Sequence, residues 1–177
     1  GVLARFLDFG CSDAPLSDKQ LLEARSGGSG GVVHVPLVMG AVVPTFNLVD
    51  AKGSPIPLRF TGPRRANIYL GKVTKWNDEA LAANNPGVTL PEMAIKVVYR
   101  KAGSGTTHIW TDYLSKASSA WKGQVGVGNK VAWPVGEGAE KNNGVADMVS
   151  RKSGAIGYVE LSYALANDLP VGIVKNR

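Results

Sequence analysis

The order of apolar strands and amphipathic helices constrains this 177-residue chain more than any other feature of its sequence. Residues 94–100 are an apolar segment, the loop Gly103-Ser-Gly-Thr-Thr107 follows, and apolar residues then recur at helical spacing up to about Lys116. Later, a helix opened by Asn143-Gly144 precedes an apolar strand over 155–159 and a further helix. This alternation predicts an α/β fold with mainly parallel sheets flanked by helices.

The beginning of the chain predicts a short strand, a loop and a helix. Residues 4–12 mix aromatic and aliphatic side chains with Asp and Gly, which is typical of a short buried strand that ends in a loop. The segment Ser17-Asp-Lys-Gln20 is a capping box, so we expect a helix over about 18–25 with Leu21 and Leu22 facing the core.

A longer apolar stretch and three short elements follow. Residues 32–43 are largely β-branched, which predicts a strand buried on both faces. Beyond it we predict a turn over 50–55, a short helix or strand over 66–69 and a capped helix over 77–83.

Composition excludes several classes of protein. Hydrophobic residues make up 44% and charged residues 19%, which is typical of a globular protein rather than a disordered chain or a coiled coil. One cysteine permits no internal disulfide, and with two histidines it disfavours a nitrogen- or sulfur-ligated metal site. The net charge of +6 is spread along the chain, and we expect no nucleic-acid partner.

The glycine loop at 103–107 carries the strongest chemical signal. A strand that feeds a Gly/Ser/Thr loop at a helix start points backbone N–H groups outward, where they bind anions. Ser104 and Thr106 add hydroxyl donors, and Arg100 can add a charge-assisted contact. The loop matches neither a Walker A motif nor a dinucleotide fingerprint. A capped helix whose glycines only form the turn is the alternative that spacing leaves open.

Two other groups of polar residues have competing interpretations. Ser104, His108 and Asp112 lie four residues apart on one predicted helix face, which superficially suggests a hydrolase. Because position 102 is Ala, Gly-x-Ser-x-Gly is not matched, and solvated polar residues explain the spacing better. Asp13, taken alone, is either a loop cap or a site carboxylate.

Several motifs in order resemble one family, the periplasmic phosphate-binding proteins of the bacterial high-affinity phosphate ABC transporter. They are Phe9-Gly-Cys-Ser-Asp-Ala-Pro-Leu16, Val38-Met-Gly-Ala-Val-Val-Pro44, Ile68-Tyr-Leu-Gly-Lys-Val-Thr-Lys-Trp-Asn77, Gly103-Ser-Gly-Thr-Thr107 with Asp112-Tyr-Leu-Ser-Lys116, and Gly154-Ala-Ile-Gly-Tyr-Val-Glu160. The resemblance implies a two-lobed type II periplasmic-binding-protein fold that closes on one phosphate and delivers it to membrane permease subunits. It implies no catalysis and no cofactor, and a periplasmic or cell-envelope location with any targeting segment outside this chain.

Residue by residue, the resemblance implies a phosphate site of Asp13, Arg100, Ser104, Gly105 and Thr106. The Asp13 carboxylate can accept the proton of hydrogen phosphate, whereas sulfate brings none and meets a bare negative charge. Family loops commonly place an Asp two residues after the arginine; here that residue is Ala, so the orientation of Arg100 is in doubt. Cys11 beside the aspartate is a mild departure.

The resemblance also implies how the chain divides. We expect residues 1–41 and 158–177 to be parts of an incomplete first lobe, residues 42–157 to be the second lobe, and the chain to be truncated at both ends. A site open on one side predicts weakened phosphate affinity, since water reduces charge interactions. The alternative function is an interaction protein that pairs with its missing segments or with a second copy and binds phosphate weakly or not at all.

Overall fold

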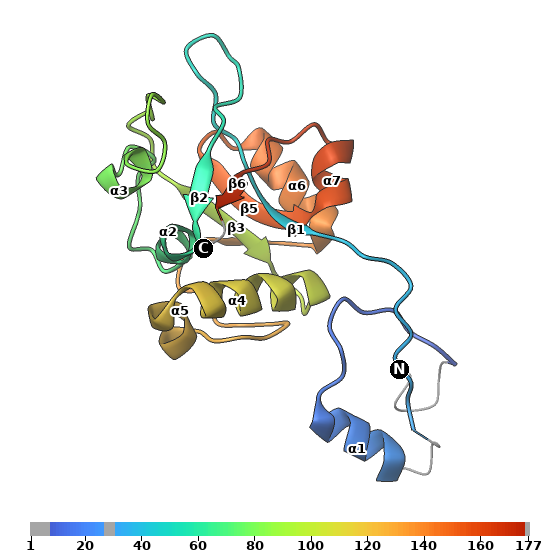
Figure 1. Cartoon of the computed structure of the whole chain (residues 1–177). Helices are drawn as coiled ribbons and strands as arrows, with labels where there is room; N and C mark the ends of the chain where they lie inside the picture. The colour runs from blue at the N-terminus through green and yellow to red at the C-terminus, as the bar shows by residue number, and fades with distance from the viewer. Residues whose placement is uncertain (1–7, 27–30, 176–177) are drawn as a thin grey trace. The chain divides into compact units, whose positions relative to one another are not determined.

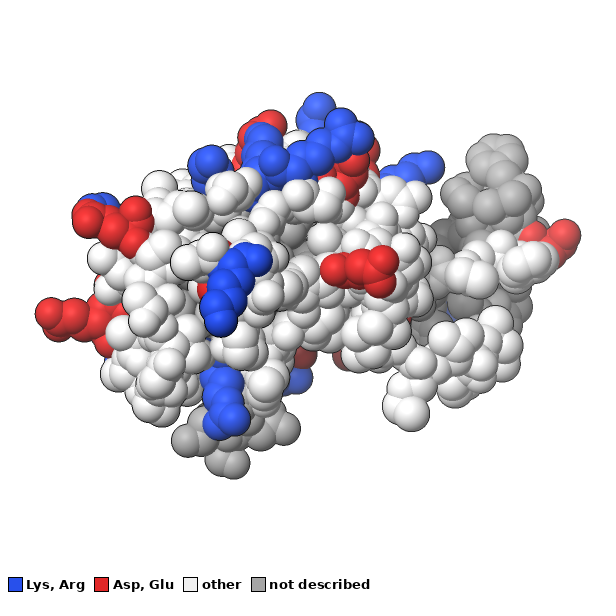
Figure 2. Space-filling model, turned by 90° about the horizontal axis from the view of Figure 1, so that it is seen from above, with Lys and Arg blue, Asp and Glu red and all other residues white. Residues whose placement is uncertain are grey.

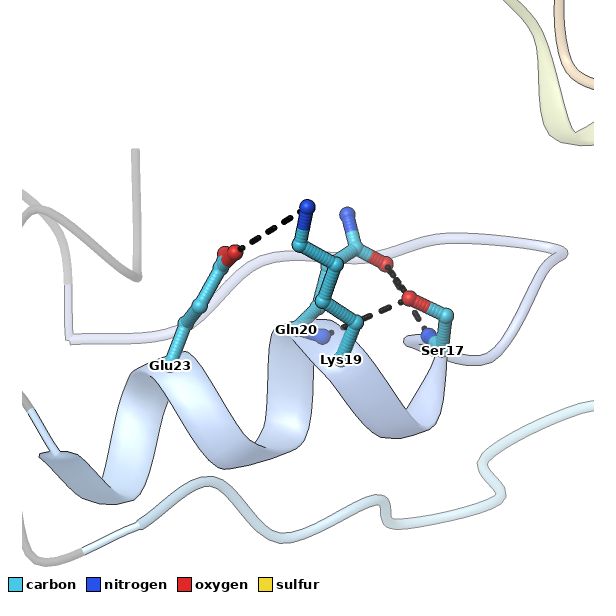
Figure 3. A network of polar contacts seen from close by, with 4 residues as sticks. All are labelled: Ser17, Lys19, Gln20 and Glu23. Atoms are coloured by element: carbon cyan, nitrogen blue, oxygen red, sulfur yellow. Dashed lines mark hydrogen bonds and ion pairs between the residues drawn. The ribbon is translucent and has the colours of Figure 1, made fainter.

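The computed structural model describes residues 8–26 and 31–175, and the chain divides into two compact units, residues 1–39 and 40–177. Helix α1 (Asp18–Ser26) lies in the first unit. Its capping box forms as predicted: Ser17 N–H donates to Gln20 Oε1 over 2.9 Å, and Gln20 N–H donates to Ser17 Oγ over 3.4 Å (Figure 3). The predicted lobe boundaries stay a prediction; in this structure residues 158–177 fall in the second unit.

Two predictions for the first unit are wrong where the structure describes it. Residues 8–12 form no strand, and Phe9 is 79% exposed; the rest of the predicted strand, up to residue 7, lies outside the described residues. Leu22 is 61% exposed rather than facing a core. Of the described residues in this unit only Ala24 is buried, so its apolar side chains have little core to join.

The second unit is built on a mixed, mainly parallel sheet (Figure 1). Its strand order is β1 (Val42–Phe46), β5 (Ala155–Glu160), β3 (Lys96–Arg100) and β4 (Glu137–Ala139). Strand β1 runs antiparallel to β5, whereas β5, β3 and β4 run parallel to one another. A separate parallel pair joins β2 (Arg59–Thr61) to β6 (Ile173–Lys175).

Helices cover both faces of this sheet (Figure 1). Helices α6 (Lys141–Arg151) and α7 (Leu161–Ala166) pack on one face, and α2 (Gly62–Tyr69), α4 (Gly105–Ala117) and α5 (Ser119–Gln124) lie on the other; α3 (Glu79–Ala82) stands to the side. The sequence of β5 is apolar without alternation because both faces of this strand are buried. Ile156 and Tyr158 enter the core on the α4 side, and Ala155 and Val159 enter the core under α6.

The strand predicted over 32–43 is displaced in the structure. Residues 31–40 form no strand and are largely exposed, and β1 begins at Val42 and extends to Phe46. The apolar run marks an extended segment, but a strand forms only where the backbone finds a pairing partner, here β5. The predicted strands over 94–100 and 155–159, and the helices that follow them, are confirmed with small shifts at their ends.

Candidate anion-binding site

Helix α4 begins directly after the glycine loop, at the carboxyl end of β3. Ser104 is its N-cap: the Ser104 Oγ accepts from Thr107 N–H over 3.4 Å, and the Ser104 N–H donates to the Asn129 carbonyl over 2.9 Å. Ser104 and Thr106 are both buried, and Gly105 is partly exposed. The first N–H groups of a helix have no acceptor within it, and the helix dipole favours negative charge there. The start of α4 is therefore suited to receive an anion.

Arg100 is the last residue of β3 and is held at two points. Its backbone N–H donates to Tyr158 Oη over 3.1 Å, and its Nη1 donates to Asn142 Oδ1 over 2.8 Å. The Arg100 Nε is buried and has no hydrogen-bond partner among the described residues. The guanidinium thus carries its positive charge at the end of β3 and is oriented there by Asn142.

The hydroxyl of Tyr158 joins the end of β3 to the start of α4. Besides accepting from the Arg100 N–H, Tyr158 Oη lies 2.7 Å from Thr107 Oγ1, and both side chains are buried. Burial raises the pKa of Tyr158 to about 12, despite its hydrogen bonds with Thr107 and the Arg100 backbone. The phenol therefore stays neutral at physiological pH, and sequence reasoning did not identify its role.

Asn142 is a second residue that sequence reasoning missed. It lies on the first turn of α6, which begins just after β4. Arg100 is paired with Ala139 of β4, so the ends of two neighbouring parallel strands bring Arg100 and Asn142 together across 42 positions of sequence. In the sequence, the sign of such a contact is a polar residue that directly follows a strand, because the carboxyl ends of parallel strands lie at one edge of the sheet.

Asp13 belongs to the first unit and is exposed. The hydroxyl of Ser12 forms hydrogen bonds with the Ala14 backbone around it, at 2.9 Å to the carbonyl and 3.1 Å from the N–H. Cys11 is an exposed free cysteine. The role of Asp13 in a phosphate site stays a prediction.

The structure gives no support to a triad on α4. Asp112 Oδ2 forms an ion pair with Lys116 at 2.6 Å, and Ser104 Oγ accepts from the backbone of Thr107. These contacts cap and stabilise the helix. Within the described ranges, no group of three or more His, Cys, Asp or Glu side chains is placed to hold a metal ion, and no helix is long and apolar enough to cross a membrane.

Charges of both signs are interspersed on the face of the molecule in Figure 2, where Lys and Arg side chains stand next to Asp and Glu side chains. Ion pairs of the second unit join Lys101 to Glu140 at 3.8 Å, Arg151 to Asp147 at 2.8 Å, and Lys152 to Glu137. An extended nucleic-acid surface instead needs basic side chains clustered on one face.

Fold and site together define the class of protein. The second unit is an α/β lobe whose parallel strands end at a capped helix start and a fixed arginine, and ligands of open α/β sheets bind at this carboxyl edge. The chain belongs to the PBP superfamily, since a model of the PBP superfamily domain matches residues 2–174.

The chain is a homologue of phosphate-binding proteins named PstS. It is 45% identical to the phosphate-binding protein PstS of Xylella fastidiosa (strain 9a5c) over 175 residues, which are 99% of this chain and 46% of that protein. It is 42% identical to PstS of Pasteurella multocida, over 99% of this chain and 49% of that protein. The chain thus spans about half the length of these curated relatives.

Solved structures agree on the fold. A high-affinity periplasmic phosphate-binding protein bound with phosphate, PfluDING, superposes with a TM-score of 0.75 at 22% identity, covering 98% of this chain and 49% of that one. A phosphate-binding protein from Stenotrophomonas maltophilia gives a TM-score of 0.65 at 22% identity, over 93% of this chain and 49% of that one. The α/β fold predicted from sequence is therefore confirmed.

Proposed function

We propose that this chain binds inorganic phosphate and serves as a substrate-binding component of an ABC-type phosphate importer, without catalysis. The observation that carries the proposal is that β3 ends at Arg100, whose guanidinium is oriented by Asn142, just before the capped start of α4. Homology to PstS proteins over nearly the whole chain supports phosphate as the anion.

Each residue of the proposed site has a distinct role. Arg100 supplies a charge-assisted hydrogen bond, and Ser104, Gly105 and Thr106 supply donors at the positive end of α4. Asp13 accepts the proton of hydrogen phosphate and disfavours sulfate, which has no proton to give. The donors serve any tetrahedral oxyanion, so selectivity belongs to the carboxylate.

The proposed partners are the permease subunits of the importer, and the proposed location is the periplasm or cell envelope. A solved structure of the same fold is described as a periplasmic phosphate-binding protein, which supports this location. The chain spans about half the length of its relatives, so the proposed partners and location are those of a binding protein of which this chain forms a part.

Phosphate titration followed by amide NMR tests the proposal. Adding phosphate up to millimolar concentrations to the 177-residue chain should shift the amide signals of residues 100–107. Arg100→Ala should weaken the affinity about 10- to 100-fold, because a hydrogen bond to a charged group contributes about 1.5–3 kcal/mol.

Arg151→Ala is the matched control, since it removes the same charge from the far end of α6, where Arg151 pairs with Asp147 at 2.8 Å. This variant should bind phosphate like the unmodified chain. Absence of shifts in residues 100–107, or equal affinity in Arg100→Ala and Arg151→Ala, would contradict phosphate binding at this edge.

A further inference from the structure

We propose that Asn142 is the positioning residue for Arg100, and that its neutrality leaves the arginine's positive charge available to a doubly charged anion. This inference rests on the proposed function, since it concerns how the same site selects the charge of its ligand. The residue that orients Arg100 then lies on α6, and not in the glycine loop that follows Arg100 in the sequence.

The contact that carries the inference joins two chain segments at one sheet edge. Arg100 Nη1 donates to Asn142 Oδ1 over 2.8 Å, a hydrogen bond in a partly buried setting. The register that pairs Arg100 with Ala139 fixes the distance between the two strand ends, and α6 begins two residues after Ala139. The sheet register therefore places Asn142 where it can orient the guanidinium.

The side chain that accepts the hydrogen bond from Arg100 is the neutral amide of Asn142, where a carboxylate would carry a negative charge. Position 102, two residues after Arg100, is an exposed alanine and offers no side-chain oxygen. The Glu140 carboxylate, next to α6, lies 3.8 Å from Lys101 Nζ instead. Within the second unit, no described carboxylate forms an ion pair with Arg100, so Asn142 orients this charge without a carboxylate of that unit neutralising it.

A carboxylate at position 142 would keep the acceptor and cancel part of that charge. Asp has the shape of Asn, so Asn142→Asp separates charge from orientation, whereas Asn142→Ala removes the orienting oxygen. A negative charge near the site repels the dianion of phosphate about twice as strongly as the monoanion. The affinity of Asn142→Asp should therefore fall most on the alkaline side of the phosphate titration.

Other titratable groups must be considered in that pH dependence. Those on the surrounding elements are Tyr158 on β5, Lys101 after β3, His108 on α4, and Glu140 and Lys141 at the start of α6. All of them are present in every variant, so the comparison between variants cancels their contribution to first order.

The experiment measures phosphate affinity by amide NMR as a function of pH in three variants. Asn142→Ala should bind about tenfold more weakly at every pH, because the hydrogen bond that orients Arg100 is lost. Asn142→Asp should lose affinity several-fold more for the dianion than for the monoanion. Asn143→Asp, the same charge change on the next and exposed residue, should stay within about twofold of the unmodified chain.

A second readout needs no phosphate. The guanidinium N–H signals of Arg100 should show restricted rotation in the unmodified chain and in Asn142→Asp, and free rotation in Asn142→Ala. Unmodified chain that binds no phosphate would overturn the proposed function. If the chain binds phosphate, unchanged affinity in Asn142→Ala, or equal losses for both phosphate ions in Asn142→Asp, would overturn the role of Asn142.

Discussion

Arg65 places a cation in the core of the second unit. The residue is 1% exposed, its guanidinium lies 4.4 Å from the ring centre of Tyr113 and 5.8 Å from that of Trp110, and its Nη2 donates to Tyr113 Oη. Burial lowers the pKa of Arg65, and its Nε has no hydrogen-bond partner among the described residues. Aromatic faces and one hydroxyl offset the cost of burying this charge only in part.

Replacing Arg65 by an apolar side chain of similar length should therefore cost little. Arg65→Met should leave the free energy of unfolding within about 1 kcal/mol of the unmodified chain or raise it, because it fills the space without a buried charge. Arg65→Ala should lower that free energy by about 2–4 kcal/mol, because it leaves a cavity between α2 and α4. Urea unfolding measures both, and equal losses in the two variants would show that the charge itself stabilises the fold.

At the level of elements, Gly157 decides how closely α6 approaches the sheet. A Cβ added at this position of β5 would lie 2.8 Å from Val145 Cγ1 and 3.0 Å from Val149 Cγ2. Both valines are fully buried on α6, so neither can move aside without displacing the helix. The first turn of the same helix carries Asn142.

Gly157→Ala should lower the free energy of unfolding by about 1–3 kcal/mol, the usual cost of overpacking a core. Gly123→Ala is the control: Gly123 lies in α5, and an added Cβ meets nothing within 4 Å. That change should be neutral or stabilise by up to about 1 kcal/mol, since alanine favours a helix. Urea unfolding of both variants checks the contrast, and a neutral Gly157→Ala would mean that α6 packs less tightly.

The elements also show how far local sequence carries a prediction. Helix α4 and its Ser104 cap were predictable because the strand, the glycine loop and the apolar spacing all lie within one short segment. The strand placed over 32–43 was displaced, because pairing with β5 depends on a segment more than a hundred residues away. The same reason applies to Asn142 and Tyr158: their contacts with Arg100 depend on which strands pair, and these strands lie far apart in the sequence.

At the level of the whole molecule, the second unit is organised around neutral buried phenols. Tyr69 and Tyr158 are fully buried, and their rings lie 5.6 Å and 5.3 Å from the ring of Trp110. Burial raises the pKa of Tyr158 to about 12 and that of Tyr69 well above its usual value. In strong alkali the folded chain therefore keeps both phenols protonated, whereas the unfolded chain loses those protons.

This difference predicts how stability falls at high pH. Because the folded pKa of each phenol lies above the unfolded value of about 10, the stability contributed by keeping them protonated is complete below about pH 10 and is lost as the pH rises toward the folded pKa. Each such tyrosine steepens the fall in the free energy of unfolding by about 1.4 kcal/mol per pH unit in that window.

In Tyr158→Phe the fall should be shallower by about that amount between about pH 10 and 12, whatever the loss of the Thr107 and Arg100 hydrogen bonds costs at neutral pH. Urea unfolding at a series of alkaline pH values measures the slope. Tyr163 is only partly buried against the core under α6, so Tyr163→Phe is the control for removing a phenol outside the fully buried pair. A slope in Tyr158→Phe identical to that of the unmodified chain and of this control would contradict a buried neutral Tyr158.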